Sequence, residues 1–136
     1  MVDQFLGKKY KLASSENFDE FMKALGVGFA TRKAGSMVSP IVELTKADDS
    51  YTLSSNSTFK KVVFSFKSGI EFDQETPDGR MVKSTITVDG NKLHEIQKDP
   101  KGGDETVIDR IFSDDEIRME LKCGEVNALR IYKIQP

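Results

Sequence analysis

Arg130 and Tyr132 stand two positions apart near the carboxyl end of the chain. In a β-strand, residues two apart point to the same face, where a guanidinium and a phenol can together hold a carboxylate. The same spacing also allows the opposite arrangement, in which Leu129 and Ile131 face the core and the polar pair faces solvent. The local pattern leaves both arrangements open.

Arg110 presents a similar choice. In segment 106–112 it shares a strand face with Thr106, Ile108 and Phe112. Its aliphatic stem can pack among these neighbours while the charged head stays in water. Alternatively, the whole side chain lies inside the protein, where an unpaired charge is costly and an anion is needed to balance it.

The rest of the sequence offers no catalytic constellation. His94, the only histidine, sits beside Glu95 in an ordinary strand segment, and Cys123 follows an apolar face where a thiol packs as a small hydrophobic group. No His and Cys spacing for a metal, phosphate-binding loop or nucleophile motif occurs. We therefore expect a binding protein that is not an enzyme, with no catalytic residues, no metal and no cofactor.

Strands are the predicted elements that position these residues. Turn signals such as the Asp-Gly pairs at 78–79 and 89–90 recur at short, even intervals. Between the turns lie segments rich in Val, Ile, Thr, Phe and Tyr, which predict about ten strands. Short connections favour antiparallel neighbours, so an all-β, up-and-down barrel is expected. The predicted strands are 9–13, 41–45, 51–54, 61–66, 70–72, 82–88, 93–97, 106–112, 117–123 and 128–134.

One region breaks the strand pattern. Apolar residues at positions 18, 21, 22 and 25 recur at helical spacing and predict a helix over 15–25. Ser14 or Ser15 is expected to cap its start, and Gly26 to end it. Residues 27–34 predict a second helical piece, so a helix-turn-helix is expected between the first two strands.

The barrel is expected to enclose a cavity. About eight strands make a barrel that side chains can fill, and ten make a wider one. The segment 117–123 is apolar on one face only, but 82–88 mixes apolar and polar residues on both faces, and the strands carry many Ser and Thr and no Trp. These features favour a partly hydrated interior over a dry core.

Composition limits the classes of function. The length of 136 residues predicts a single domain spanning 1–136, and the net charge of −2 argues against nucleic acid as a partner. No apolar run or leader pattern predicts a membrane span or secretion, and a single Cys fits a reducing cytoplasm. The basic residues Lys23, Arg32 and Lys33 form either a solvated helix face or a patch for acidic lipids.

The sequence resembles the fatty-acid-binding protein family of the intracellular lipid-binding proteins over essentially its whole length. The resemblance is carried by 8–12 (KKYKL), 17–25 (NFDEFMKAL), 26–33 (GVGFATRK), 57–60 (STFK), 64–67 (FSFK), 71–73 (EFD), 78–84 (DGRMVKS) and 130–132 (RIY). It is most similar in form to muscle-type and invertebrate members. It departs from the family at Tyr10, where Trp is usual, and at Phe21, where Tyr is common. The family fold is a ten-stranded antiparallel barrel, the clam, opened by a gap between two strands and lidded by a helix-turn-helix.

The resemblance implies a carrier of one long-chain fatty acid. Family retinol binders usually have Gln at the anchoring positions, so two arginines favour a carboxylic acid. A carrier of retinoic acid or another hydrophobic carboxylic acid, and an adaptor whose ligand alters a helical surface, remain alternatives. The family also implies a cytoplasmic monomer in transient contact with anionic membranes, with nuclear entry left open. The implied site residues are Arg110, Arg130 and Tyr132 for the carboxylate; Phe18, Met22, Pro40, Asp78, Arg80, Met119 and Leu121 for the pocket wall; Phe29, Thr31, Arg32 and Phe59 for the portal; and Lys23, Arg32 and Lys33 for membrane contact.

Overall fold

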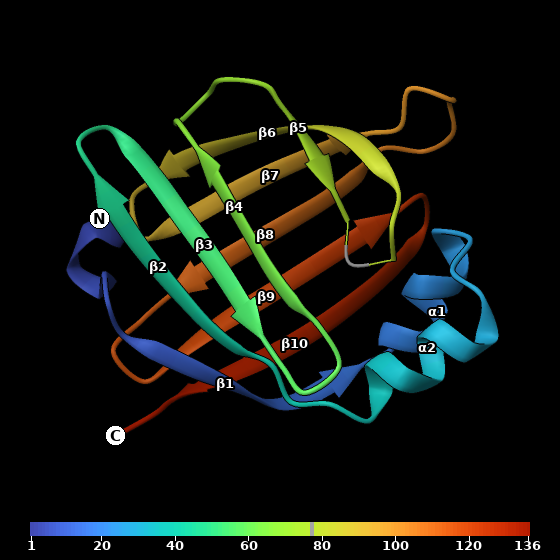
Figure 1. Ribbon diagram of the computed structural model, residues 1–136, viewed down its shortest axis with the longest axis horizontal. Coiled ribbons are helices and arrows are strands. Elements are labelled where there is room, and N and C mark those ends of the chain that lie inside the picture. The colour runs from blue at the N-terminus through green and yellow to red at the C-terminus, as the bar shows by residue number, and fades with distance from the viewer. Residues whose placement is uncertain (77) are drawn as a thin grey trace.

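Ten antiparallel strands form one curled sheet in the computed structural model, which describes residues 1–76 and 78–136. Their order is β4-β3-β2-β1-β10-β9-β8-β7-β6-β5, so strands that are consecutive in the sequence pair with each other, except β4 and β5, and β1 pairs with β10 (Figure 1). The strands are β1 (Lys9–Glu16), β2 (Ile41–Ala47), β3 (Ser50–Asn56), β4 (Lys61–Phe66), β5 (Phe72–Glu75), β6 (Met81–Asp89), β7 (Lys92–Lys98), β8 (Thr106–Phe112), β9 (Glu116–Cys123) and β10 (Val126–Ile134). The all-β barrel expected from the sequence is confirmed.

The two edges of the sheet, β4 and β5, share no ladder of hydrogen bonds. Aromatic side chains bridge them instead. The ring of Phe72 on β5 stacks on Phe64 and Phe66 of β4, at centroid distances of 5.9 and 6.4 Å. Stacked rings hold the edges together by apolar contact and leave the backbone unpaired, so the barrel is nearly but not completely closed.

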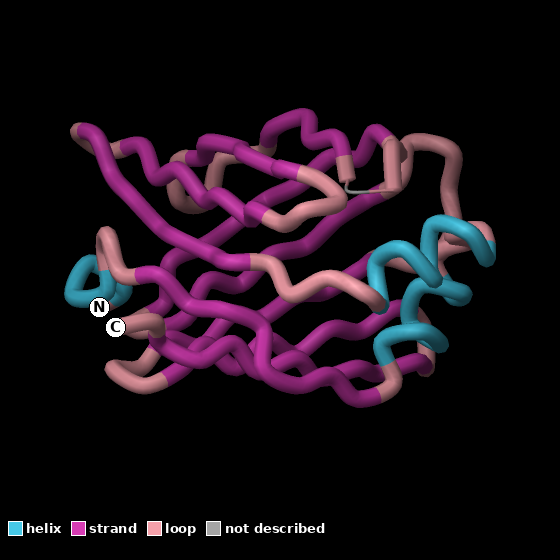
Figure 2. Tube along the Cα trace, turned by 60° about the horizontal axis from the view of Figure 1, so that its bottom comes forward, coloured by secondary structure: helices cyan, strands magenta, loops and turns pink. Residues whose placement is uncertain are grey.

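Two short helices, α1 (Phe18–Ala24) and α2 (Phe29–Ser36), lie between β1 and β2 and cover one end of the barrel (Figures 1 and 2). Gly26 ends α1 as predicted, with a positive φ of 86°. The predicted cap at Ser14 or Ser15 is wrong. Both serines continue β1 and pair with Ile131 and Arg130 of β10, so the helix begins one turn later, after Asn17.

The opposite end of the barrel is filled by side chains. A 3₁₀ helix, η1 (Val2–Phe5), lies there beside both chain termini, and the sequence pattern missed it because four residues show no measurable period (Figure 2). Its backbone is tied to the barrel by a 2.8 Å bond from the Val2 N–H to the Gly90 carbonyl. The fully buried Phe112 stacks on Phe5 and meets Tyr10 edge-on, at centroid distances of 6.0 and 5.9 Å. This end of the barrel is therefore a packed core.

This packing predicts very different costs for two phenylalanine truncations. Phe112→Ala should lower the free energy of unfolding by about 3–5 kcal/mol, because it opens a void in the packed end. Phe59→Ala is the matched control: its ring is 49% exposed, and the loss should stay within about 0.5 kcal/mol. Urea denaturation of both variants measures the difference. Similar midpoints for the two variants would contradict the division into a packed end and a hollow end.

Candidate functional site

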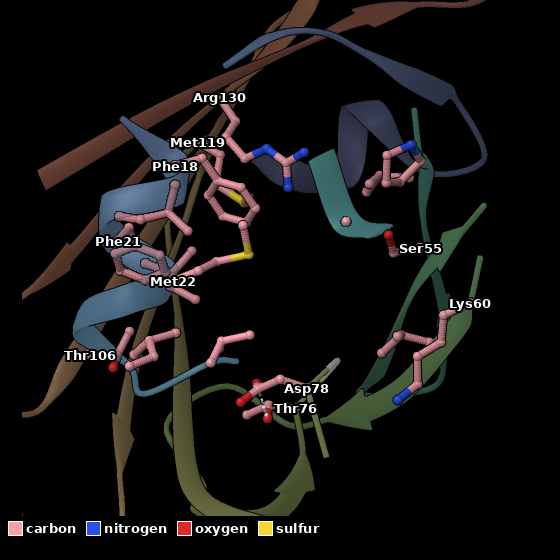
Figure 3. Close-up of a pocket in the computed structure, with 18 of the residues that line it drawn as sticks. Phe18, Phe21, Met22, Ser55, Lys60, Thr76, Asp78, Thr106, Met119 and Arg130 are labelled. Carbon is pink, nitrogen blue, oxygen red and sulfur yellow. Dashed lines mark hydrogen bonds between the residues drawn. The ribbon is translucent and has the colours of Figure 1, made fainter. Parts of the chain in front are cut away.

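A cavity of about 230 Å³ lies inside the barrel below the helices (Figure 3). Its lining is apolar on the helix side and includes buried polar side chains from β5, β7, β8 and β10. All seven predicted wall residues line it: Phe18, Met22, Pro40, Asp78, Arg80, Met119 and Leu121. Of the predicted portal residues, Thr31 and Phe59 also line the cavity, whereas Phe29 points outward with 69% of its surface exposed. Whether these residues contact a ligand stays a prediction.

Burial decides between the two arrangements that the sequence left open for β10. Ala128, Arg130 and Tyr132 are buried on the inner face, while Leu129 and Ile131 are only half-buried on the outer face. Register explains this choice, because Arg130 lies opposite Met119 and Tyr132 opposite Ile117, both on the inner face of β9. The strand thus turns its charged residue inward, against the usual preference of hydrophobic residues for the interior.

The Arg130 guanidinium is held by two neighbours from different elements. Its central carbon lies 3.9 Å from the ring centroid of Phe18 on α1, and its Nε donates a 3.0 Å hydrogen bond to Ser15 Oγ on β1. Among residues 1–76 and 78–136, no carboxylate lies within ion-pair distance of it. Burial lowers the pKa of Arg130, and the nearby Tyr132 phenol partly offsets this effect. Within the described residues, the side chain is therefore a buried cation without a carboxylate partner.

Tyr132 lies beside this cation. The Arg130 guanidinium carbon is 5.8 Å from the centroid of the Tyr132 ring, and the side chain is 4% exposed. Within the described part of the chain, the Tyr132 hydroxyl has no hydrogen-bond partner, although the residue lines the cavity. A buried cation and a hydroxyl donor on one face have the chemistry that binding of an oxyanion requires.

Arg110 also lines the cavity, but its charge is already balanced. Its Nη1 donates a 2.7 Å bond to Oε1 of Glu95, whose side chain is fully buried. The second oxygen of Glu95 accepts a 2.8 Å bond from Gln97 Nε2. Sequence reasoning missed Glu95. The available signal was its strand face, which it shares with Leu93 and Gln97 and which β7 turns inward.

A second charged pair lies on the wall after β5. Asp78 accepts a 2.7 Å bond from Arg80 Nε and another of 2.7 Å from the Thr76 hydroxyl. Burial by itself raises the pKa of the Asp78 carboxyl, but the bonds from Arg80 and Thr76 outweigh it and leave the pKa below its ordinary value. Asp78 is therefore ionised, and the pair adds no net charge to the cavity.

The three basic residues on the helices differ in their surroundings. Arg32 donates a 2.7 Å bond to the Val27 carbonyl and a 3.1 Å bond to Asp19, so it ties α2 to the α1 region with only 14% of its side chain exposed. Lys23 lies near Asp19 and Glu20, at 3.6 and 3.2 Å. Lys33 is exposed on α2 and takes part in no ion pair within the described residues. The local charge is therefore concentrated at Lys33.

Two further features bear on the kind of site. Neither α1, α2 nor any other helix in residues 1–76 and 78–136 has the length and apolar character to cross a bilayer. In the same described residues, no three His, Cys, Asp or Glu side chains converge as ligands for a metal ion. Cys123 packs with Phe21, Ile108, Leu121 and Ala128, as its apolar strand face predicted.

The sequence model described as Lipocalin / cytosolic fatty-acid binding protein family matches residues 6–135. The chain belongs to this family. Its sequence is 51% identical to a muscle fatty acid-binding protein of Schistocerca gregaria over 99% of this chain and all of that protein. The predicted similarity to muscle-type and invertebrate members is thereby confirmed.

Solved structures of the family agree with this assignment. A fatty acid-binding protein from brain tissue of Drosophila melanogaster is 56% identical, with a TM-score of 0.89 over 95% of this chain and 98% of that chain. A Schistosoma mansoni fatty acid binding protein, in complex with arachidonic acid, is 43% identical, with a TM-score of 0.93 over 99% of this chain and 98% of that chain.

A buried cation with no carboxylate partner in the described residues should lower the free energy of unfolding of the ligand-free protein. We expect Arg130→Gln to raise the free energy of unfolding of the ligand-free protein by about 1 kcal/mol, because the neutral amide removes a desolvated charge. Arg118→Gln is the control, since Arg118 pairs with Glu120 on the exposed outer face of β9 and should change little. Delipidated protein must be used for the urea titration. A destabilised Arg130→Gln variant would show that the cation is well compensated.

Proposed function

We propose that the chain reversibly binds one long-chain fatty acid in its cavity and carries it without chemical change. The observation that carries the proposal is the buried Arg130 guanidinium beside the unused hydroxyl of Tyr132, in a cavity with apolar walls. The arrangement matches a ligand with one carboxylate and a long apolar tail. The names of the relatives, including one in complex with arachidonic acid, support the same ligand class.

Energetics favour an apolar tail with an oriented head group. Burial of a palmitate-sized tail of about 15 carbons contributes roughly 12 kcal/mol before costs, at about 0.8 kcal/mol for each CH₂. The ligand loses conformational freedom in its tail and translational and rotational freedom as a whole, and these losses offset part of the gain. The carboxylate adds charge-assisted hydrogen bonds to Arg130 and Tyr132 and so sets the direction of the ligand. Arg110 lies on the same cavity wall, but Glu95 already occupies its guanidinium, so a direct role of Arg110 at the carboxylate stays a prediction.

Ligand entry is proposed at the helical end. Phe59 lies in the turn between β3 and β4, lines the cavity and is half-exposed, which suits a side chain that moves when a ligand passes. Thr31 lies near the same opening on α2. The family description as cytosolic supports a cytoplasmic location for this exchange. A monomeric state and entry into the nucleus stay predictions.

Delivery by contact with anionic membranes is the second part of the proposal. Helix α2 carries the exposed cation Lys33, and the exposed apolar side chains of Phe29 and Met37 lie at its two ends. An exposed cation with nearby apolar side chains favours the surface of an acidic bilayer. Arg32 and Lys23 contribute less to the attraction toward an anionic membrane, since Asp19 and Glu20 form ion pairs with them. We therefore assign most of the electrostatic attraction to Lys33.

The carboxylate role of Arg130 predicts a difference between an acid and its ester. Arg130→Gln should weaken binding of a fatty acid about tenfold to a hundredfold, since a hydrogen bond to a charged group contributes roughly 1.5–3 kcal/mol. Binding of the methyl ester should change little. Calorimetric titration of both ligands measures the difference, with Arg118→Gln as the outer-face control. Equal losses for acid and ester would rule out the carboxylate role.

The membrane proposal predicts a charge-dependent rate of transfer. Lys33→Glu should slow movement of a fluorescent fatty acid to anionic vesicles about tenfold at low salt, because each charge near an acidic surface contributes about 1 kcal/mol. Lys9→Glu changes the same charge at the other end of the barrel and is the matched control. The effect should fade as salt rises, since the screening length falls to about 8 Å near physiological ionic strength. A rate independent of vesicle concentration would mean that the ligand leaves through water.

A further inference from the structure

The cavity contains paired and unpaired charges. Arg110 and Glu95 form one neutral pair at 2.7 Å, and Arg80 and Asp78 form another at 2.7 Å. Lys60, in the turn between β3 and β4, also lines the cavity and is engaged in an interaction of its own. Within the described residues, Arg130 has no carboxylate partner. The deep wall therefore holds two arginines with unequal access to an incoming anion.

Strand register fixes the relative positions of the two arginines. Arg110 on β8 and Arg130 on β10 both lie opposite Met119 on β9, so all three belong to one row across the sheet. Neighbouring strands are about 4.8 Å apart, and the two arginine backbones are thus separated by about 10 Å. Both side chains line the same cavity. A ligand head with two carboxylates has the reach to meet both guanidinium groups.

Glu95 prevents that double contact. It lies diagonally across from Arg110, opposite Ile108 on the neighbouring strand, where a long side chain reaches the next row. Its side chain is fully buried, and each carboxylate oxygen accepts one hydrogen bond, from Arg110 and from Gln97. A second anion brought to Arg110 would meet the negative charge of Glu95 in a poorly solvated wall, where like charges repel strongly.

We infer that Glu95 is a specificity-determining residue: by occupying Arg110 it restricts the cavity to ligands with a single carboxylate and directs that carboxylate to Arg130. The inference rests on the proposed function and adds the reason for its choice of head group. Glu95 touches no ligand in this role. It acts by neutralising the positive charge of Arg110, which a second carboxylate would need as a partner. The same effect gives the ligand one direction in the cavity, because the two arginines no longer compete for the head group.

A comparison of two head groups on one tail tests the inference. The probes are a long-chain fatty acid and a 2-alkylsuccinate of the same chain length, with both carboxylates of the succinate ionised. The wild-type protein should bind the monocarboxylate at least tenfold more tightly. Glu95→Gln keeps the shape and the hydrogen-bond acceptor but frees the charge of Arg110, and should shift the affinity ratio toward the alkylsuccinate by tenfold or more. Glu120→Gln is the matched control, since it removes a carboxylate from an ion pair on the outer face.

A second variant guards against loss of folding. The double variant Glu95→Gln and Arg110→Gln replaces the buried pair by two neutral amides, so it should retain the wild-type preference for one carboxylate. An affinity ratio that stays within twofold of wild type in folded Glu95→Gln, or a double variant that gains alkylsuccinate binding, would overturn the inference. If wild type binds neither probe, the proposed function itself fails, and that result is distinct from an unchanged ratio.

Discussion

The Arg130 guanidinium lies between the ring of Phe18 and the hydroxyl of Ser15, where the first strand, the first helix and the last strand of the barrel meet. A desolvated cation is costly unless nearby groups stabilise it. Here the aromatic face and one hydroxyl stabilise the charge only in part, and burial lowers the pKa of the side chain. The charge that remains uncompensated is the basis of the proposal that the interior binds an anion. The same contacts connect the helical lid to the place where the ligand head is proposed to bind.

The interior of the barrel is divided into a packed end and an open end. At the end beside η1, aromatic side chains including Phe5, Tyr10 and Phe112 fill the space and provide a packed core. At the helical end the wall stays open, and its buried polar groups bond to one another, as Ser84 does to Gln74 and Gln97 to Glu95. The packed core and the proposed binding cavity thus lie toward opposite ends of one sheet. Because Arg130 is a desolvated charge outside the packed end, its removal is expected to weaken binding without weakening the fold.

Charge pairing inside the cavity then determines which cation remains available. The family resemblance implies the same role for Arg110 and Arg130, as two arginines around one carboxylate. The structure separates them, because a glutamate of the same wall already balances Arg110. The helical surface shows the same principle: of three basic residues close in sequence, two lie against Asp19 or Glu20, and Lys33 stands apart. In both places, the acidic groups beside each basic residue decide which cation is available, and the number of basic residues does not.

The sequence by itself determined the fold, because alternation with period two and regularly spaced turns specify strands and their antiparallel order, as in 61–66 and 106–112, which have the predicted bounds. It also brought Arg130 and Tyr132 to one face, since two positions separate them. Only the tertiary structure decided which face of the last strand points inward. It also decided that Ser15 accepts a hydrogen bond from Arg130 and does not cap a helix. It further decided that Glu95 neutralises the charge of Arg110. These outcomes depend on register between strands far apart in sequence, and a local pattern carries no information about the residue that lies opposite.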